Sequence, residues 1–144
     1  MLIENIEFAR LEKEPSKAGI SAVNYLAPDI GKVYVVAITR ERCPACQKQK
    51  PRLDKLAAAV KQKHKDKTVF IRIHVKRPPT SEEESLRSKN VFGHYFYPTN
   101  LILLRTQDRG VIEYYRGISP SMTELSRNIE NAVETAAMLK KEKR

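Results

Sequence analysis

Arg42-Cys43-Pro44-Ala45-Cys46-Gln47 contains the only two cysteines of the chain, and it lies between two segments of different character. Upstream, the continuous apolar and β-branched run from Val33 to Ile38 is typical of a buried parallel strand. Downstream, apolar residues recur at the spacing of one helix face, at Leu53, Leu56, Ala57 and Val60. The cysteines are therefore expected where a strand ends and a helix begins.

This position predicts a reactive cysteine. Pro44 suits the first position of a helix, which would make Cys43 the N-cap residue. A thiol there faces unpaired backbone N–H groups and the positive end of the helix dipole, and both favour the thiolate. Cys46, one turn later, is placed to attack a mixed disulfide formed at Cys43.

Cysteine pairs with this spacing also bind zinc, so a metal site and an inert structural use remain alternatives. Zinc needs two further ligands, and the chain has no second cysteine pair. Its three histidines are scattered, so we predict no metal site. Among them, His94 is the one expected to approach the cysteines. A Cys-His hydrolase is disfavoured, because a second cysteine would have no role in it.

Length and composition describe a globular protein. The 144 residues are 41% hydrophobic and 31% charged, and no apolar run approaches the ~20 residues of a membrane span. The first residues lack the basic start and apolar core of a secretory signal, which predicts a cytoplasmic protein. In a reducing cytosol, a lone cysteine pair indicates catalysis or metal binding more than a structural disulfide.

Positive charge is concentrated around the cysteines. The net charge is +10, and residues 40–67 alone hold ten Lys or Arg against three Asp or Glu. A positive field stabilises a thiolate and attracts acidic partners. The alternative is a solvated face of a Lys-rich helix. Nucleic acid is a weaker candidate, because aromatic residues do not interleave with the charges.

The first half of the chain predicts two helices and three strands. Residues 2–8 form a short strand, residues 12–17 form a polar connection, and Ser16 or Ser21 opens a helix that ends before Pro28. Further strands are expected over 32–39 and 68–75. The helix after Cys43 runs to about Lys63 and contains Pro51.

The second half predicts a helix, a hairpin and a last helix. A capping box at 81–84 opens a helix that reaches about Asn90. Strands over 100–104 and 111–115 flank a turn at 107–110, and Gly117 ends the second strand. Ser119 or Ser121 caps the final helix, which keeps a 3.6-residue apolar period.

This pattern resembles the thioredoxin superfamily. The matching features are the cysteine pair after a buried strand, the proline inside the following helix, an aromatic-Pro-Thr segment before the next-to-last strand and a glycine after the hairpin: Cys43 and Cys46, Pro51, Tyr97-Pro98-Thr99 and Gly117. The resemblance implies an α/β thioredoxin-like fold with a mixed four- to five-stranded sheet flanked by helices. It implies a single domain over 1–144, with a core of about 31–139 and an N-terminal extension of about 1–15.

The resemblance also implies roles for individual residues. Cys43 would be the nucleophile and Cys46 the resolving cysteine. The substrate would be bound by residues beside them: Pro44, Ala45, Tyr97, Pro98 and Thr99. Pro98 would be a cis-proline that faces the disulfide, although the sequence alone leaves both isomers of the Tyr97-Pro98 bond open.

The chain departs from thioredoxins at three places. It has no Trp, and Arg42 stands where thioredoxins have one. Proline comes first between the cysteines, as in glutaredoxin-like motifs. Ala37 stands where thioredoxins bury an acid that assists proton transfer. These departures count against efficient thioredoxin-type turnover and against recycling by a thioredoxin reductase.

The predicted function is a thiol-disulfide oxidoreductase that reduces, oxidises or isomerises protein disulfides. The cysteine pair would be its own redox centre, with no other cofactor. Its partners would be protein disulfides and a thiol reductant or reductase, with no membrane. The alternative is a redox-inactive thioredoxin-fold module that docks acidic proteins through the basic face formed by residues 40–67.

Overall fold

A computed structural model describes residues 2–142, so Met1 and residues 143–144 of the expected domain lie outside it. The strands are β1 (Ile3–Glu7), β2 (Val33–Arg40), β3 (Thr68–Val75), β4 (Thr99–Arg105) and β5 (Val111–Ile118). The helices are α1 (Phe8–Lys17), α2 (Ala22–Leu26), α3 (Pro44–His64), α4 (Glu83–Phe92) and α5 (Met122–Lys141), with a short 3-10 helix at Lys65–Lys67.

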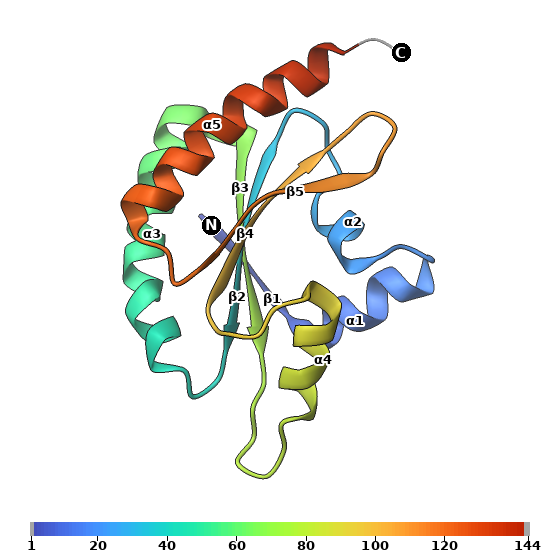
Figure 1. Ribbon diagram of the computed structural model, residues 1–144, viewed down its shortest axis with the longest axis vertical. Helices are drawn as coiled ribbons and strands as arrows, with labels where there is room; N and C mark the ends of the chain where they lie inside the picture. The colour runs from blue at the N-terminus through green and yellow to red at the C-terminus, as the bar shows by residue number, and fades with distance from the viewer. Residues whose placement is uncertain (1, 143–144) are drawn as a thin grey trace.

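The strands form one mixed sheet in the order β1-β3-β2-β4-β5 (Figure 1). β1 and β2 both pair in parallel with β3, whereas β4 pairs antiparallel with β2 and β5. β2 is buried along almost its whole length, which confirms the central strand predicted from its apolar run. The mixed sheet flanked by helices is the α/β fold expected from the sequence.

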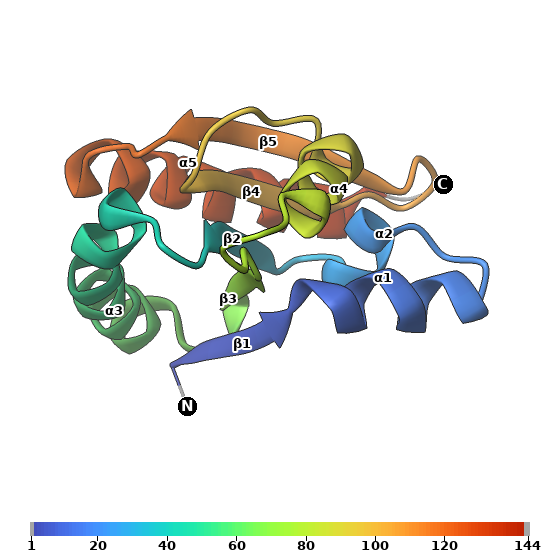
Figure 2. The same ribbon diagram turned by 90° about the horizontal axis from the view of Figure 1, so that it is seen from below.

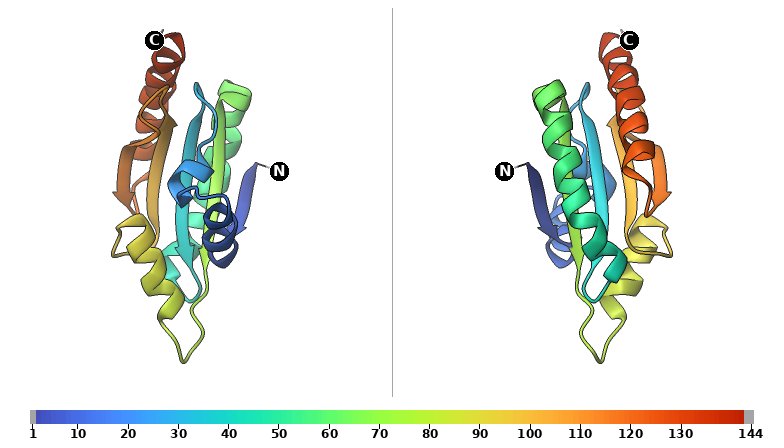
Figure 3. Two further views of the ribbon diagram at one scale, coloured as in Figure 1. Left: turned by 90° about the vertical axis from the view of Figure 1, so that its right-hand side faces the viewer. Right: turned by 90° about the vertical axis from the view of Figure 1, so that its left-hand side faces the viewer.

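Helices cover both faces of the sheet (Figures 2 and 3). α3 and α5 pack on one face, where Val35 and Ile102 meet Leu53 and Leu125. α1, α2 and α4 cover the other face, where the alternate residues of the same strands are buried around Phe8. Because successive side chains of a strand point to opposite faces, β2 contributes to both cores. This packing fixes the start of α3 against the end of β2.

The chain near the N-terminus differs from the expectation in one element. Residues 12–17, expected as a connection, belong to α1. Phe8, Leu11 and Pro15 lie on one side of that helix and are buried. Their burial outweighs the polar composition and the missing N–H of Pro15. β1 is present as predicted and pairs with β3, so the residues expected as an N-terminal extension supply an edge strand and most of α1.

Two boundaries in the second half also differ. The expected capping box at 81–84 is wrong: α4 begins at Glu83, and Glu84 accepts a hydrogen bond from the backbone of Lys76 instead. Gly117 lies inside β5, not after it. A Cβ at Gly117 would overlap the hydroxyl of Tyr115, so any larger residue there would require the Tyr115 side chain to move. Ser121, one of the two expected caps of α5, accepts the N–H of Glu124 at 3.1 Å.

No helix within residues 2–142 combines the length and the apolar character that crossing a membrane requires.

Candidate active site

The two cysteines form a disulfide at the first turn of α3. Cys43 is the N-cap residue and Pro44 the first residue of the helix, as predicted. The backbone N–H of Cys46 donates a hydrogen bond to Sγ of Cys43 at 3.2 Å, and the two Cα atoms are 5.3 Å apart. The helix N-terminus therefore directs an N–H at the sulfur of Cys43.

The disulfide lies just below the surface. Cys43 is 4% exposed and Cys46 7% exposed, whereas Arg42, Pro44 and Ala45 are exposed. Arg42 turns the chain from β2 into α3 with a φ of 55°, in the left-handed region that non-glycine residues rarely occupy. A partner that reaches the sulfur atoms must therefore contact these exposed neighbours.

The backbone of Tyr97, the residue before Pro98, lies beside Cys43. The Tyr97-Pro98 peptide bond is cis, which answers the question that the sequence left open. The carbonyl oxygen of Tyr97 is 3.7 Å from Sγ of Cys43. Pro98 and Thr99 are buried, and the Thr99 hydroxyl donates to the carbonyl of Phe96 at 2.7 Å. The five residues expected to bind substrate thus differ in exposure. Pro44 and Ala45, in α3, are exposed. Pro98 and Thr99 are buried, and Tyr97 directs its backbone carbonyl at Cys43.

Tyr97 is held in place by three groups: one from β2, one from α4 and one from the segment between α4 and β4. Its hydroxyl donates to the carbonyl of Ser85 at 3.0 Å, and its ring meets the ring of His94 edge-on at 4.8 Å. The guanidinium of Arg40 lies 4.8 Å from the ring centroid, a cation–π distance. These contacts fix the position of the carbonyl that faces Cys43.

His94, the histidine expected near the cysteines, packs against Tyr97, and both of its ring nitrogens bond to groups other than the sulfur atoms. Its Nδ1 donates to the carbonyl of Phe96 and its Nε2 accepts from the Ser88 hydroxyl, both at 3.0 Å. This pairing requires the neutral imidazole. Burial, together with smaller effects of the nearby charges of Arg116 and Lys89, lowers the pKa of His94 from 6.5 to about 4, although the hydrogen bond to the Phe96 carbonyl acts in the opposite direction. His94 is therefore a fixed neutral group in the wall of the site.

Arg40 brings positive charge to the same wall. Burial, and then the charge of Arg77, lower the pKa of the Arg40 guanidinium. Its Nε is buried and has no hydrogen-bond partner among the described residues. Arg77, in contrast, pairs with Glu82 at 2.8 Å. The charge of Arg40 is thus uncompensated by a direct ion pair within residues 2–142.

A buried pair of amides lies under the first turns of α3. Gln49, one turn after Cys46, donates from Nε2 to Oδ1 of Asn100 at 2.7 Å. Both residues are buried, and Nδ2 of Asn100 has no partner in the described part of the chain. Asn100 pairs in register with Ala37, the position where thioredoxins bury an acid. Neutral amides therefore occupy the layer beneath the cysteines.

A cavity on the side of the sheet that α2 covers has no cysteine in its lining. It measures about 1000 Å³ and is lined by β-strand residues such as Ile6 and Ile71 together with Tyr25 of α2. A smaller cavity of about 170 Å³ begins at Ala45, between the two cysteines. Because chemistry needs the sulfur atoms, we assign the site to the small cavity and its surroundings. Within residues 2–142, no three His, Cys, Asp or Glu side chains are grouped as a metal site.

Sequence reasoning did not find several residues of the site. Gln49 carried a weak signal, since it lies three residues after Cys46 and so on the same side of the helix. Asn100 and Arg40 carried none, because their partners are more than fifty residues away. Ser85 and Ser88 carry no signal either, because they lie among other polar residues of α4.

Comparison with known proteins identifies the fold. No protein-family model and no curated protein sequence matches the chain. Among solved structures, thioredoxin from Trichomonas vaginalis superposes with a TM-score of 0.59 and 14% identity, covering 91% of this chain and 97% of that chain.

Two plant proteins give similar results. Thioredoxin NaTrxh from Nicotiana alata has a TM-score of 0.57 and 20% identity over 89% of this chain and 91% of that chain. Thioredoxin f from spinach chloroplast has a TM-score of 0.56 and 16% identity over 90% and 85%. Together with the sheet order and the disulfide at the start of α3, these similarities show that the chain has the thioredoxin fold.

Proposed function

We propose that the chain is a thiol-disulfide oxidoreductase in which Cys43 is the nucleophile and Cys46 the resolving cysteine. One observation carries the proposal: the only two cysteines are bonded to each other at a helix N-terminus, beside the backbone of a proline turn. The coarser assignment, a thiol oxidoreductase with the thioredoxin fold, also fits the solved thioredoxins that superpose on the chain.

The reaction needs only the cysteine pair. In the reducing direction, the Cys43 thiolate attacks one sulfur of a substrate disulfide and releases the other as a thiolate. The Cys46 thiolate then attacks Sγ of Cys43, which releases the second substrate sulfur and forms the Cys43–Cys46 disulfide. Two electrons pass to the substrate, and an external thiol returns them to the protein. The structure holds the disulfide form, which is the product of this direction and the reactant of the reverse one.

Activation of Cys43 follows from its position. The Cys46 N–H that now reaches Sγ of Cys43 would stabilise a thiolate at the same place. The helix dipole and the cations that follow in α3 act in the same direction. We therefore expect iodoacetamide to label reduced Cys43 with a midpoint below about pH 8.5, the value of an ordinary free thiol. A midpoint at or above that value would contradict the activation.

Substrate binding is proposed for the residues around the disulfide. Pro44 and Ala45 are exposed and can contact a polypeptide joined to Cys43. Tyr97 presents its carbonyl, while the buried Pro98 and Thr99 hold the turn. A substrate strand would pair with this backbone and not with the side chains of the turn.

The direct test is insulin reduction by dithiothreitol, with the native chain and with Cys43→Ser. The native chain should accelerate the precipitation of the insulin B chain, and Cys43→Ser should fall to the uncatalysed rate. Cys46→Ser should retain the first step and accumulate a mixed disulfide at Cys43, detectable as an added mass. Catalysis that survives in Cys43→Ser would overturn the proposal.

A second candidate is a binding module without redox activity. The exposed face of α3 favours it, because Arg42, Lys48, Lys50, Arg52 and Lys55 are exposed and none of them pairs with a carboxylate of residues 2–142. Such a module would dock acidic proteins. The double variant Cys43→Ser/Cys46→Ser would keep this binding, which would weaken steeply with salt. For either function we propose a reducing compartment such as the cytosol, where a recycling thiol is available.

A further inference from the structure

A small groove lies at the first turns of α3, next to Ala45. It has a volume of about 170 Å³, and α3 forms one wall with Ala45, Lys48 and Arg52. The other wall is formed by Ser119 and Pro120, from the segment between β5 and α5, and by Met122, the first residue of α5. The groove therefore includes Ala45, the residue that immediately precedes Cys46 in the chain.

The second wall is tied to the proline turn. The backbone N–H of Ser119 donates to the carbonyl of Pro98 at 3.1 Å, and Ser119 holds a φ of 43°. Gln49 forms part of the lining and is fixed by its bond to Asn100. Both the Gln49 side chain and the Ser119 backbone that line the groove are therefore held by hydrogen bonds.

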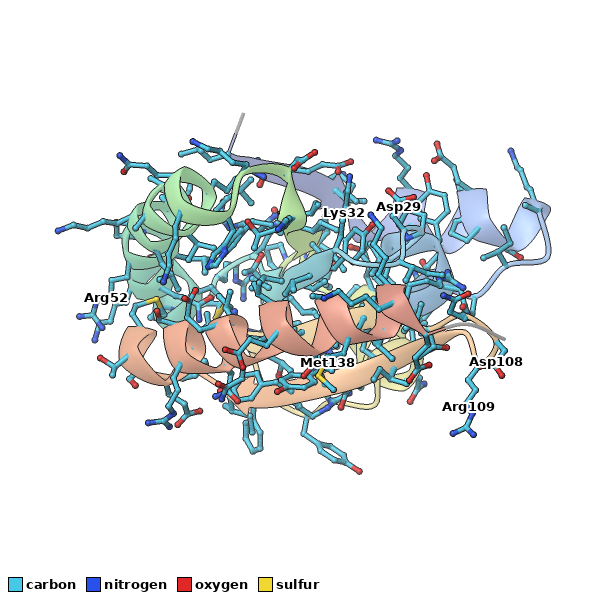
Figure 4. All side chains as sticks on the ribbon, turned by 90° about the horizontal axis from the view of Figure 1, so that it is seen from above. Asp29, Lys32, Arg52, Asp108, Arg109 and Met138 are labelled. Atoms are coloured by element: carbon cyan, nitrogen blue, oxygen red, sulfur yellow. A yellow bond between two sulfur atoms is a disulfide. The ribbon has the colours of Figure 1, made fainter. Side chains whose placement is uncertain are left out.

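The charged residues that line the groove are all basic. Lys48 and Arg52 line it, and no Asp or Glu does. The nearby acids are engaged elsewhere, since Asp54 pairs with Arg72 at 3.0 Å and Glu124 accepts the hydroxyl of Tyr115. Arg52 projects outward from α3 at the end of the molecule where α5 begins (Figure 4). Lys48 and Arg52 are four residues apart and so lie on one side of the helix.

We propose that this groove selects disulfide substrates that carry a Glu or Asp within three residues of the target cysteine. The inference rests on the proposed function and names the substrate class of the same site. The acidic side chain would enter the groove from the segment joined to Cys43 and pair with Lys48 and Arg52. This selection is local, and it is distinct from attraction by the basic face of α3 as a whole.

The test uses symmetrical disulfide dimers of an eight-residue peptide with one cysteine and otherwise Ala, Gly and Ser. One position, scanned over three residues on each side of the cysteine, is Glu, Gln or Lys. The reduced protein is mixed with excess dimer at low salt, and released peptide thiol is followed after acid quench. Each turnover converts one protein dithiol and one peptide disulfide into one protein disulfide and two peptide thiols.

At the best position, the Glu peptide should react about fivefold faster than the Gln peptide, the effect of an exposed ion pair of up to ~1 kcal/mol. The preference should shrink in 0.5 M salt. Lys48→Gln/Arg52→Gln should abolish it while still reducing the Gln peptide. The matched control Lys50→Gln/Lys55→Gln removes the same charge from exposed positions of the same helix outside the groove, and it should keep the preference.

The outcomes separate the two proposals. Equal rates for the Glu, Gln and Lys peptides, or a control variant that loses the preference as fully as the groove variant, would overturn the groove and leave the oxidoreductase standing. Failure to release thiol from any peptide would overturn both. Tighter binding of a single-stranded oligonucleotide than of the Glu peptide, lost in the groove variant, would assign the groove to nucleic acid and also overturn the proposal.

Discussion

The two sides of the disulfide are built differently. On the α4 side, the Tyr97 ring is held by Ser85, His94 and Arg40, and the hydrogen-bonding atoms of His94 are fully used. On the α5 side, a groove stays open between Lys48 and Met122. Under the proposed function, the first arrangement would position backbone for the reaction, and the second would leave room for a substrate. The geometry of the reaction and the choice of substrate would then depend on different sides of the disulfide.

The strongest test of this difference between the two sides is to remove the ring of Tyr97. Tyr97→Ala should lower the free energy of unfolding by about 3 kcal/mol, because a packed aromatic ring and its hydrogen bond are lost. Urea denaturation measures this. Tyr95→Ala is the control, since Tyr95 is 80% exposed two residues away and should cost less than about 0.5 kcal/mol. Equal losses would show that the α4 side is not rigidly anchored.

The second largest effect is expected from acid, which should destabilise the α4 side of the disulfide through His94. The pKa of His94 is about 4 in the folded chain, below its ordinary 6.5, so between those values the unfolded state binds more protons. Stability is therefore lost as pH falls from about 6.5 towards 4, by about 2–3 kcal/mol between pH 7 and pH 4.5. His94→Gln should be less stable at pH 7 but show a flatter pH profile. A parallel profile for both proteins would exclude His94 as the cause.

The floor of the groove should show a smaller effect. Gln49→Leu leaves the buried Asn100 amide without its partner, which should cost about 1–2 kcal/mol. The double variant Gln49→Leu/Asn100→Leu should lose less than the sum of the two single variants, as a double-mutant cycle in urea would reveal. Strict additivity would mean that the two amides do not support each other.

Substitutions on the α5 side of the disulfide, where the groove lies, should affect stability least. Lys48→Gln/Arg52→Gln should change the free energy of unfolding by less than about 0.5 kcal/mol, because both side chains are exposed and form no ion pair within residues 2–142. Thermal or urea unfolding checks this. A loss above 1 kcal/mol would mean that these cations serve the fold, and the contrast between the two sides would no longer hold.

The sequence predicted the fold and the disulfide well, because their signals are local. The strand before Cys43, the proline after it and the period of α3 are all contained in about thirty residues. β2, α3 and β3 appear where these patterns place them. The failure at α1 has a physical cause, because a polar segment becomes helical when Phe8, Leu11 and Pro15 gain a core to pack against.

The side chains around the disulfide could not be predicted in the same way. The partners of Arg40 and Gln49 are distant in sequence, and only the pairing of β2 with β4 brings Ala37 and Asn100 together. The groove joins residues 45–52 to residues 119–122, so no local window contains both walls. Contacts of this kind depend on tertiary packing and leave no periodic signal.

The order of the strands also bears on how copies of this protein meet in concentrated solution. β1 and β5 form the two edges of the sheet, and an uncovered edge can recruit a strand from another molecule. Glu4 and Glu7 are exposed on β1, and Glu113 and Arg116 form an ion pair at 2.6 Å on β5. An incoming strand would have to strip water from these charges at either edge. Charged residues of this kind disfavour the pairing of two sheet edges.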